Sequence, residues 1–162
     1  MTFVIDAFNL IYKFDDLEDL MYTGKLAEAR QGLLRKLVAS NARRKKPLGY
    51  IVFVDGKKMP GSDLRSDTEG PIPVHYSHDL SADFLIRKYI EQTVRPREFT
   101  VISSDKKVRE HARASRCKSQ SSEDFAREIQ NLLREQSASP PEKDEGLSAE
   151  EVAYGARLFG KK

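Results

Sequence analysis

Short apolar runs alternate with segments of helical periodicity along the chain. Apolar, often β-branched residues fill 2–5, 50–54 and 99–102, and such unbroken runs are typical of strands buried on both faces of a parallel sheet. A weaker strand is predicted at 72–76 and a short one around Cys117. Strands that alternate with helices predict an α/β fold, with three α/β/α layers around a central, mainly parallel sheet.

Helical spacing of apolar residues marks the segments between the strands. One helix is predicted within 24–44, with Thr23 as its N-cap, and another after Ser81, which is likewise expected to cap its helix. Further helices are predicted over 106–114 and from Ser122. Each of these segments carries an apolar stripe that can cover a sheet.

The chain divides by composition into a domain and an appendage. Residues 1–135 are expected to form one α/β domain, in which 57–71 make an exposed loop rich in charge, proline and glycine. Residues 136–146 are a polar linker with prolines, and 147–162 are predicted to form a short amphipathic helix. A helix this short is marginal alone, so we expect it to dock on its own domain, on a second copy in a homodimer, or on another partner.

Composition narrows the class of protein. Charged residues make up 33% and hydrophobic residues 39% of 162 residues, which fits a soluble globular domain. The longest apolar stretches are strand-sized, so no membrane span is expected, and no secretion signal is visible at the N-terminus. A cytoplasmic location is therefore expected. The single Cys117 cannot form an internal disulfide, in agreement with a reducing compartment.

Four aspartates stand where apolar runs end or a helix begins. Asp6, Asp55 and Asp105 follow predicted strands, and Asp83 lies in the first turn of the helix after Ser81. Acids at the carboxyl ends of parallel strands converge on one crevice, and they repel one another unless a cation holds them. Mg²⁺ or Mn²⁺ suits such hard oxygen ligands, so a metal-dependent enzyme acting on phosphate is predicted. Taken singly, Asp83 could instead interact with the dipole of its helix, and Asp55 could instead form a turn.

Basic residues surround the predicted acidic site. The net charge is +3, and basic residues next to an acidic metal site suit an enzyme that must attract a nucleic-acid backbone. A separate block at 43–46 follows a helix, where it could equally be a solvated face that complements the helix dipole. Ser104 could orient Asp105 or reach a phosphate. The candidates to steer the backbone are Lys57, Lys58, Arg87, Lys106 and Lys107.

Four short motifs in order resemble those of a known family. The segment 4–11 (VIDAFNLI) resembles the opening "DGYN"-like motif of NYN domains, and 52–56 (VFVDG) their second-strand ending. Residues 81–83 (SAD) resemble their "TAD" helix start, and 102–105 (ISSD) their "TSD" motif. Over about 2–135 the chain resembles a NYN domain of the PIN-like nuclease superfamily, most specifically the YacP-like group.

The resemblance implies a PIN-like α/β/α fold and a Mg²⁺- or Mn²⁺-dependent endoribonuclease. Asp6, Asp83 and Asp105 match the acidic centre of the family, with Asp55 as an additional acid at its rim, and Asn9 would position Asp6 or the substrate. Some YacP-like members are associated with ribosomes and messenger RNA cleavage. The resemblance therefore implies RNA, and messenger RNA on the ribosome, as partners.

The chain also departs from the family pattern. Ala7 replaces the usual glycine of the first motif, and Phe84 follows Asp83 where many relatives carry a second acid. Glu123 and Asp124 are the nearest candidates for a fourth core carboxylate, although a role at the start of their helix is favoured. One metal contact is thus expected to be missing, which predicts weaker metal binding.

Two other functions fit parts of the pattern. A PIN-like module could bind RNA or a ribosomal surface with little or no hydrolysis, which the reduced number of acids favours. A phosphatase or phosphotransferase of the haloacid-dehalogenase type is disfavoured, because Phe8 stands where those enzymes have a second aspartate. A zinc site at His75 and His78 is also disfavoured, since no third ligand is near in the sequence.

Overall fold

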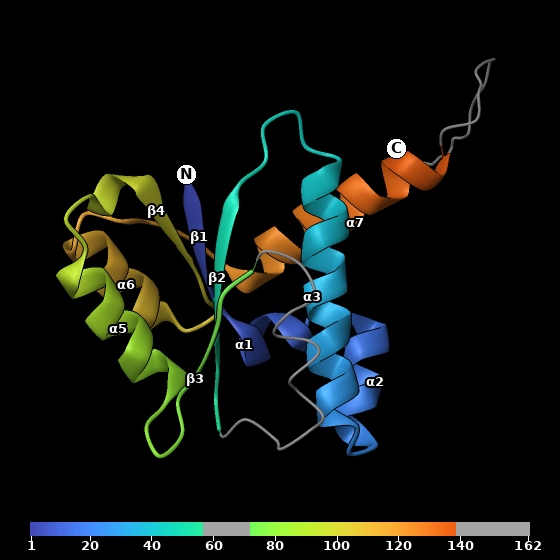
Figure 1. Ribbon diagram of the computed structural model, residues 1–162, viewed down its shortest axis with the longest axis horizontal. Helices are drawn as coiled ribbons and strands as arrows, with labels where there is room; N and C mark the ends of the chain where they lie inside the picture. The colour runs from blue at the N-terminus through green and yellow to red at the C-terminus, as the bar shows by residue number, and fades with distance from the viewer. Residues whose placement is uncertain (57–71, 139–162) are drawn as a thin grey trace. The chain divides into compact units, whose positions relative to one another are not determined.

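The central sheet is parallel throughout. The computed structural model describes residues 1–56 and 72–138, and in this part of the chain five strands follow the order β3-β2-β1-β4-β5 (Figure 1). Every neighbouring pair is parallel, which confirms the predicted α/β class. The strands are β1 (Thr2–Asp6), β2 (Gly49–Val54), β3 (Val74–Tyr76), β4 (Phe99–Ile102) and β5 (Lys118–Gln120).

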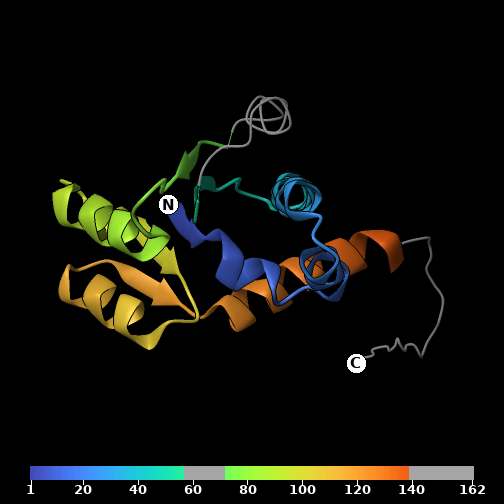
Figure 2. The same cartoon turned by 90° about the horizontal axis from the view of Figure 1, so that it is seen from below.

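Helices cover both faces of this sheet. Helices α5 and α6 lie on one face, and α1 and α3 lie on the other (Figures 1 and 2). Residues 1–130 form one compact unit, and α7 begins within it and continues through Ala138. The helices are α1 (Ala7–Ile11), α2 (Asp15–Tyr22), α3 (Leu26–Ala42), α5 (Ala82–Gln92), α6 (Lys106–Ala114) and α7 (Ser122–Ala138), with a 3₁₀ turn, η1 (Pro96–Glu98), before β4.

Alternation along β1 separates two cores. Val4 packs with Phe53, Val101 and the buried residues Ile86 and Ile90 of α5. On the opposite face, the Phe3 ring lies 6.1 Å from that of Tyr50 and 5.1 Å from that of Phe125 in α7. Successive side chains of a strand point to opposite faces, so Asp6, two residues after Val4, lies on the α5 side of the sheet.

The strand order creates a reversal beside β1. From β1 the chain adds β2 and then β3 on one side, and α5 then returns it to β4 and β5 on the other side. In open parallel sheets, ligands bind outside the carboxyl ends of the strands where the order reverses. Asp6 ends β1, and Ser103, Ser104 and Asp105 follow β4, so they flank this point.

The local predictions differ in outcome. Ser81 is the N-cap of α5, because its hydroxyl oxygen accepts a hydrogen bond from the Phe84 N–H at 3.1 Å. The prediction that Thr23 caps α3 is wrong: Thr23 ends α2, its hydroxyl donates to the Asp19 carbonyl at 3.0 Å, and Lys25 precedes α3.

Helix α2 was not predicted. Three of its eight residues are acids in the first turn, and Leu17 is its one fully buried residue, so its apolar stripe is thin. Its position depends on packing against α3. Leu17 lies so close to Gly32 of α3 that a Cβ added to this glycine would be 2.5 Å from Leu17 Cδ2. Such close helix packing is a tertiary property that periodicity does not reveal.

Two predicted segments lie outside the described residues. The loop at 57–71, with Lys57 and Lys58, is one. The other comprises 139–162, which include most of the expected linker and the whole expected C-terminal helix. Among the residues that are described, no helix is long and apolar enough to cross a membrane.

Candidate acidic active site

Asp6 is the buried centre of the site. It is the last residue of β1 and the N-cap of α1, and only 1% of its surface is exposed. Its Oδ2 accepts a hydrogen bond from Asn9 Nδ2 at 2.6 Å, whereas its buried Oδ1 has no hydrogen-bond partner in the structure. A buried carboxylate oxygen without a partner is costly unless a proton or a cation satisfies it.

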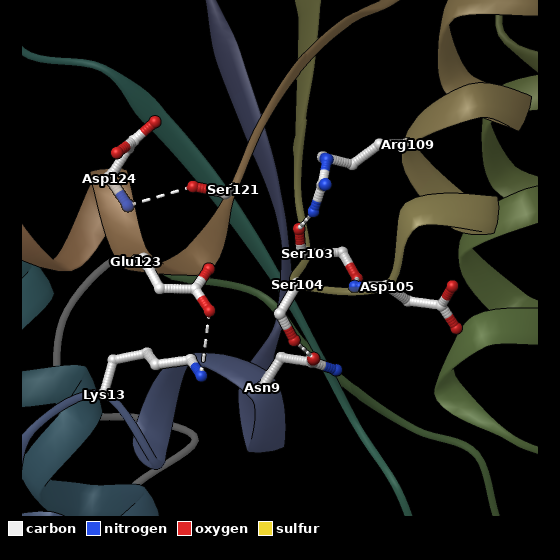
Figure 3. A network of polar contacts seen from close by, with 9 residues as sticks. All are labelled: Asn9, Lys13, Ser103, Ser104, Asp105, Arg109, Ser121, Glu123 and Asp124. Atoms are coloured by element: carbon white, nitrogen blue, oxygen red, sulfur yellow. Dashed lines mark hydrogen bonds and ion pairs between the residues drawn. The ribbon is translucent and has the colours of Figure 1, made fainter.

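Asn9 connects Asp6 to the end of β4. The Ser104 hydroxyl donates to Asn9 Oδ1 (Figure 3). Asn9 in turn donates to Asp6. Asn9 comes from α1 and Ser104 from the turn after β4, so this chain of hydrogen bonds bridges the reversal point of the sheet. The sequence indicated each residue separately, but the link between them requires that β1 and β4 be neighbours.

Burial and neighbouring charge change the acidity of Asp6. Burial is the main cause that raises its pKa to about 7, and the charges of Asp83 and Asp55 raise it further. A hydrogen bond with Asp83 also raises the pKa of Asp6, while the backbone of Asn9 lowers it. Asp6 therefore holds a proton at neutral pH to a degree that an ordinary aspartate does not.

Asp83 is the partner of Asp6. It lies in the first turn of α5 and is half-buried. Burial raises its pKa, the hydrogen bond with Asp6 lowers it, and the charges of Asp105 and Asp55 raise it. The protonation of each carboxyl group therefore depends on the other.

Asp55 ties β2 to the start of α5. Its Oδ1 accepts a hydrogen bond from the Ala82 N–H at 2.7 Å. The following Gly56 has a φ of 104°, a conformation that glycine adopts readily, and its N–H donates to Ser77 Oγ at 2.9 Å. Asp55 is half-buried and lies near enough for its charge to raise the pKa of both Asp6 and Asp83.

Asp105 approaches the cluster from β4 and α6. It is the N-cap of α6, where its Oδ1 accepts from the Lys107 N–H at 2.8 Å. Its own N–H donates to Ser103 Oγ at 3.1 Å, and the Ser103 carbonyl accepts from Arg109 Nη1 at 2.7 Å (Figure 3). The sequence did not single out Arg109, whose link to this turn depends on one helical turn of α6.

Glu123 and Asp124 lie in the first turn of α7. Glu123 forms an ion pair with Lys13 at 3.1 Å, and its pKa is lowered by its own backbone N–H, by Lys13 and by Arg109. Asp124 pairs with Arg127, and the Asp124 N–H donates to Ser121 Oγ at 3.1 Å. Both acids are exposed, and cations already neutralise them.

The donor set suits a hard divalent cation. Asp6, Asp83 and Asp105 supply carboxylate oxygens, one of them buried without a hydrogen-bond partner, and a metal ion could take the place of a proton on Asp6. Within 1–56 and 72–138, no three Asp, Glu, His or Cys side chains are already arranged as a metal-binding group. The oxygen ligands of these residues thus suit a divalent metal ion. Metal binding requires that Asp6 lose its proton.

The candidate cations occupy different places. Arg87 is exposed on α5, and Lys106 and Lys107 are exposed in the first turn of α6, directly after Asp105. Lys57 and Lys58 lie outside the described part of the chain. Lys106 and Lys107 are thus the cations that the backbone holds next to an acid of the cluster.

The sequence of the whole domain identifies its family. The model of the YacP-like NYN domain matches residues 3–153. The chain belongs to the YacP-like NYN family. No curated protein matches this sequence.

Solved structures of the YacP-like NYN family share the fold. The crystal structure of Rae1 (YacP) from Bacillus subtilis aligns with a TM-score of 0.64 at 18% identity, over 85% of this chain and 78% of that one. A point mutant of the same protein aligns with a TM-score of 0.64 at 19% identity, over 85% and 79% of the two chains. At these identities the likeness concerns the fold.

Proposed function

We propose that this protein is a divalent-metal-dependent endoribonuclease. The observation that carries the proposal is the buried Asp6 at the reversal point of the sheet, which has one oxygen without a hydrogen-bond partner and a pKa that burial and the charges of Asp83 and Asp55 raise. Strongly perturbed acids in a cluster of this kind are typical of functional sites. Membership of the YacP-like NYN family supports RNA as the substrate.

Each residue of the cluster has a distinct role in this proposal. Asp6, Asp83 and Asp105 would hold Mg²⁺ or Mn²⁺, and Asp55 keeps α5 in place at the rim of the site. When bound, the ion supplies an activated water and stabilises charge on the phosphate. Asn9 holds the Asp6 carboxylate in one orientation, and Ser104 holds the Asn9 amide.

Cations next to the acids attract the RNA backbone. Lys106 and Lys107 are exposed directly after Asp105, and Arg87 is exposed on the helix that carries Asp83. We include Lys57 and Lys58 in this group on their sequence position. The proposed substrate is messenger RNA in the cytoplasm, with the ribosome as the scaffold that presents it, and this part of the proposal follows from the family resemblance alone.

Cleavage of RNA by the Asp6→Asn variant tests the proposal. We expect a loss greater than the ~10–100-fold that removal of an outer-shell partner causes, because the substitution removes a ligand itself. The readout is Mn²⁺-dependent cleavage of a labelled RNA. Asp15→Asn, at an exposed acid of α2, is the matched control and should cleave normally. If Asp6→Asn cleaves as fast as the parent protein, the assignment is wrong.

A second function is favoured by two observations. No three carboxylates among the described residues are arranged for a metal, and Phe84 follows Asp83 where many relatives carry an acid. The protein would then bind RNA or a ribosomal surface without hydrolysing it. This alternative predicts salt-sensitive RNA binding that Asp6→Asn and Asp105→Asn leave intact, together with no cleavage in any divalent metal.

A further inference from the structure

A second basic site lies away from the acids. A concave pocket is lined by Arg97, Arg113, Arg116, Cys117 and Lys118. Its four cationic side chains come from separate elements: η1, the last turn of α6, the turn that follows α6, and the first residue of β5. The fold therefore assembles positive charge that is dispersed along the sequence.

The pocket lies at the N-terminal ends of β4 and β5, whereas the acidic site lies at the C-terminal ends of the strands. Arg97 precedes β4, whereas Ser104 and Asp105 follow it, and Lys118 opens β5. A strand of four residues spans about 13 Å. A ligand in this pocket would therefore be a different chemical group from the one at Asp6.

The described residues provide no charged partner for these cations. All four side chains are exposed, and within 1–56 and 72–138 none of them forms an ion pair. Glu98, next to Arg97 in the sequence, pairs with Arg95 instead. Arg113 donates to Ser119 Oγ at 2.8 Å, a neutral acceptor that leaves the positive charge in place.

The helix dipole does not account for this cluster. Basic residues often follow a helix because its last carbonyls lack partners. At the end of α6, however, the N–H groups of Ser115, Arg116 and Cys117 already donate to the carbonyls of His111, Ala112 and Arg113. Four cations gathered in one pocket create a positive potential that favours an anion there.

We infer that this pocket binds a backbone phosphate of the RNA, at a point away from the bond that is cut. The guanidinium group of arginine matches the oxygens of a phosphate in geometry and charge. Three arginines line the pocket. The inference rests on the proposed action on RNA. With one phosphate held here and another at the acids, the protein orients an RNA along the strands, from the end with the pocket to the end with the acids.

RNA binding without cleavage tests the pocket directly. A labelled single-stranded RNA is titrated in metal-free buffer with the Asp6→Asn protein, alone and combined with R113E/R116E. We expect about tenfold weaker binding and a salt dependence whose slope falls by about one for each phosphate that the variant no longer binds. The K25E/R35E pair, at exposed sites on and before α3, changes the net charge equally and is the matched control.

Other outcomes separate the sources of the phosphate. If R113E/R116E weakens RNA binding no more than K25E/R35E does, the inference is wrong. If RNA binding is unchanged while binding of adenosine monophosphate or inorganic phosphate is lost, the pocket serves a free phosphate and the inference is again wrong. R97E/K118E repeats the test on the other two cations, so a folding defect in one variant does not decide the result.

The proposed function and this inference can fail independently. If the parent protein cleaves no RNA under any metal while R113E/R116E still abolishes binding, the pocket stands and the nuclease assignment falls. If cleavage of a short RNA that occupies only the acidic site is lost in R113E/R116E, the two sites are not separate and the inference is overturned.

Discussion

At the residue scale, Asp6 is placed where an acid costs stability. It is almost fully buried, one of its oxygens has no hydrogen-bond partner, and Asp83 and Asp55 add negative charge around it. An enzyme accepts such a cost where an ion or a substrate later supplies the missing partner. Asn9 lessens the cost with its 2.6 Å hydrogen bond.

We predict that Asp6→Asn stabilises the protein. The folded pKa of Asp6 is about 7 and its ordinary value is 3.8, so the folded state holds more protons between these values. The stability of the parent protein is therefore lost as pH rises through this window, by about 1.4 kcal/mol for each pH unit. Asparagine does not ionise, so the gain in the free energy of unfolding should grow from pH 4 to about 7 and then level off.

Urea unfolding at several pH values measures this effect. Asp15→Asn, at an exposed position, should leave the stability profile unchanged. A stability gain for Asp6→Asn that did not depend on pH would contradict the raised pKa of Asp6, because a packing effect alone has no reason to follow the titration of a carboxyl group.

At the element scale, the start of α5 sets the position of Asp83. Ser81 caps the helix through the Phe84 N–H, and Asp55 accepts from the Ala82 N–H. Two side chains from outside the helix thus hold its first turn against the end of β2. These two hydrogen bonds therefore fix the first turn of α5, which carries Asp83.

We predict that Ser81→Ala loosens this turn. Loss of an N-cap hydroxyl costs about 0.5–2 kcal/mol. The measurements are thermal unfolding and the Mn²⁺ concentration that half-saturates cleavage, which should rise because Asp83 is less well positioned. Ser81→Thr keeps the hydroxyl and should behave like the parent protein. Equal losses in both variants would show that something other than the cap is responsible.

At the scale of the whole molecule, the order of the strands unites the site. Asp6 and Asp105 are far apart in the sequence, but β1 and β4 pair in parallel with Ile5 opposite Ile102. Because both strands end on the same side of the sheet, their acids lie there, and Asp83 of α5 interacts with both of them. The family match over 3–153 agrees with this arrangement.

Metal binding should therefore stabilise the entire domain. A ligand at ~100 times its dissociation constant adds about 2.7 kcal/mol to the free energy of unfolding. We expect Mn²⁺ to raise the melting temperature by several degrees at pH 8 and by less at pH 6, because protons compete for Asp6 below its pKa of about 7. Asp6→Asn should show a much smaller rise at both pH values. A rise of the same size in the variant would place the ion elsewhere.

Much of the fold is readable from local patterns. The apolar runs located the strands, Ser81 was recognisable as a cap from its place before an apolar stripe, and the aspartates that follow buried strands were visible as candidates. Local patterns failed at Thr23 and α2, where a short acidic helix depends on packing against α3 for its stability. Short helices form through tertiary contacts more than through propensity.

The sequence by itself determined which residues carry charge and where each strand ends, because apolar period and capping are local properties. The tertiary structure decided which of these residues meet. Neither the Ser104–Asn9–Asp6 chain nor the raised pKa of Asp6 follows from spacing, since the first requires β1 and β4 to be neighbours and the second requires α5 to lie beside β1. The basic pocket around Cys117 also arises only in the fold. Burial and electrostatic coupling depend on distances in space, and strand order sets those distances.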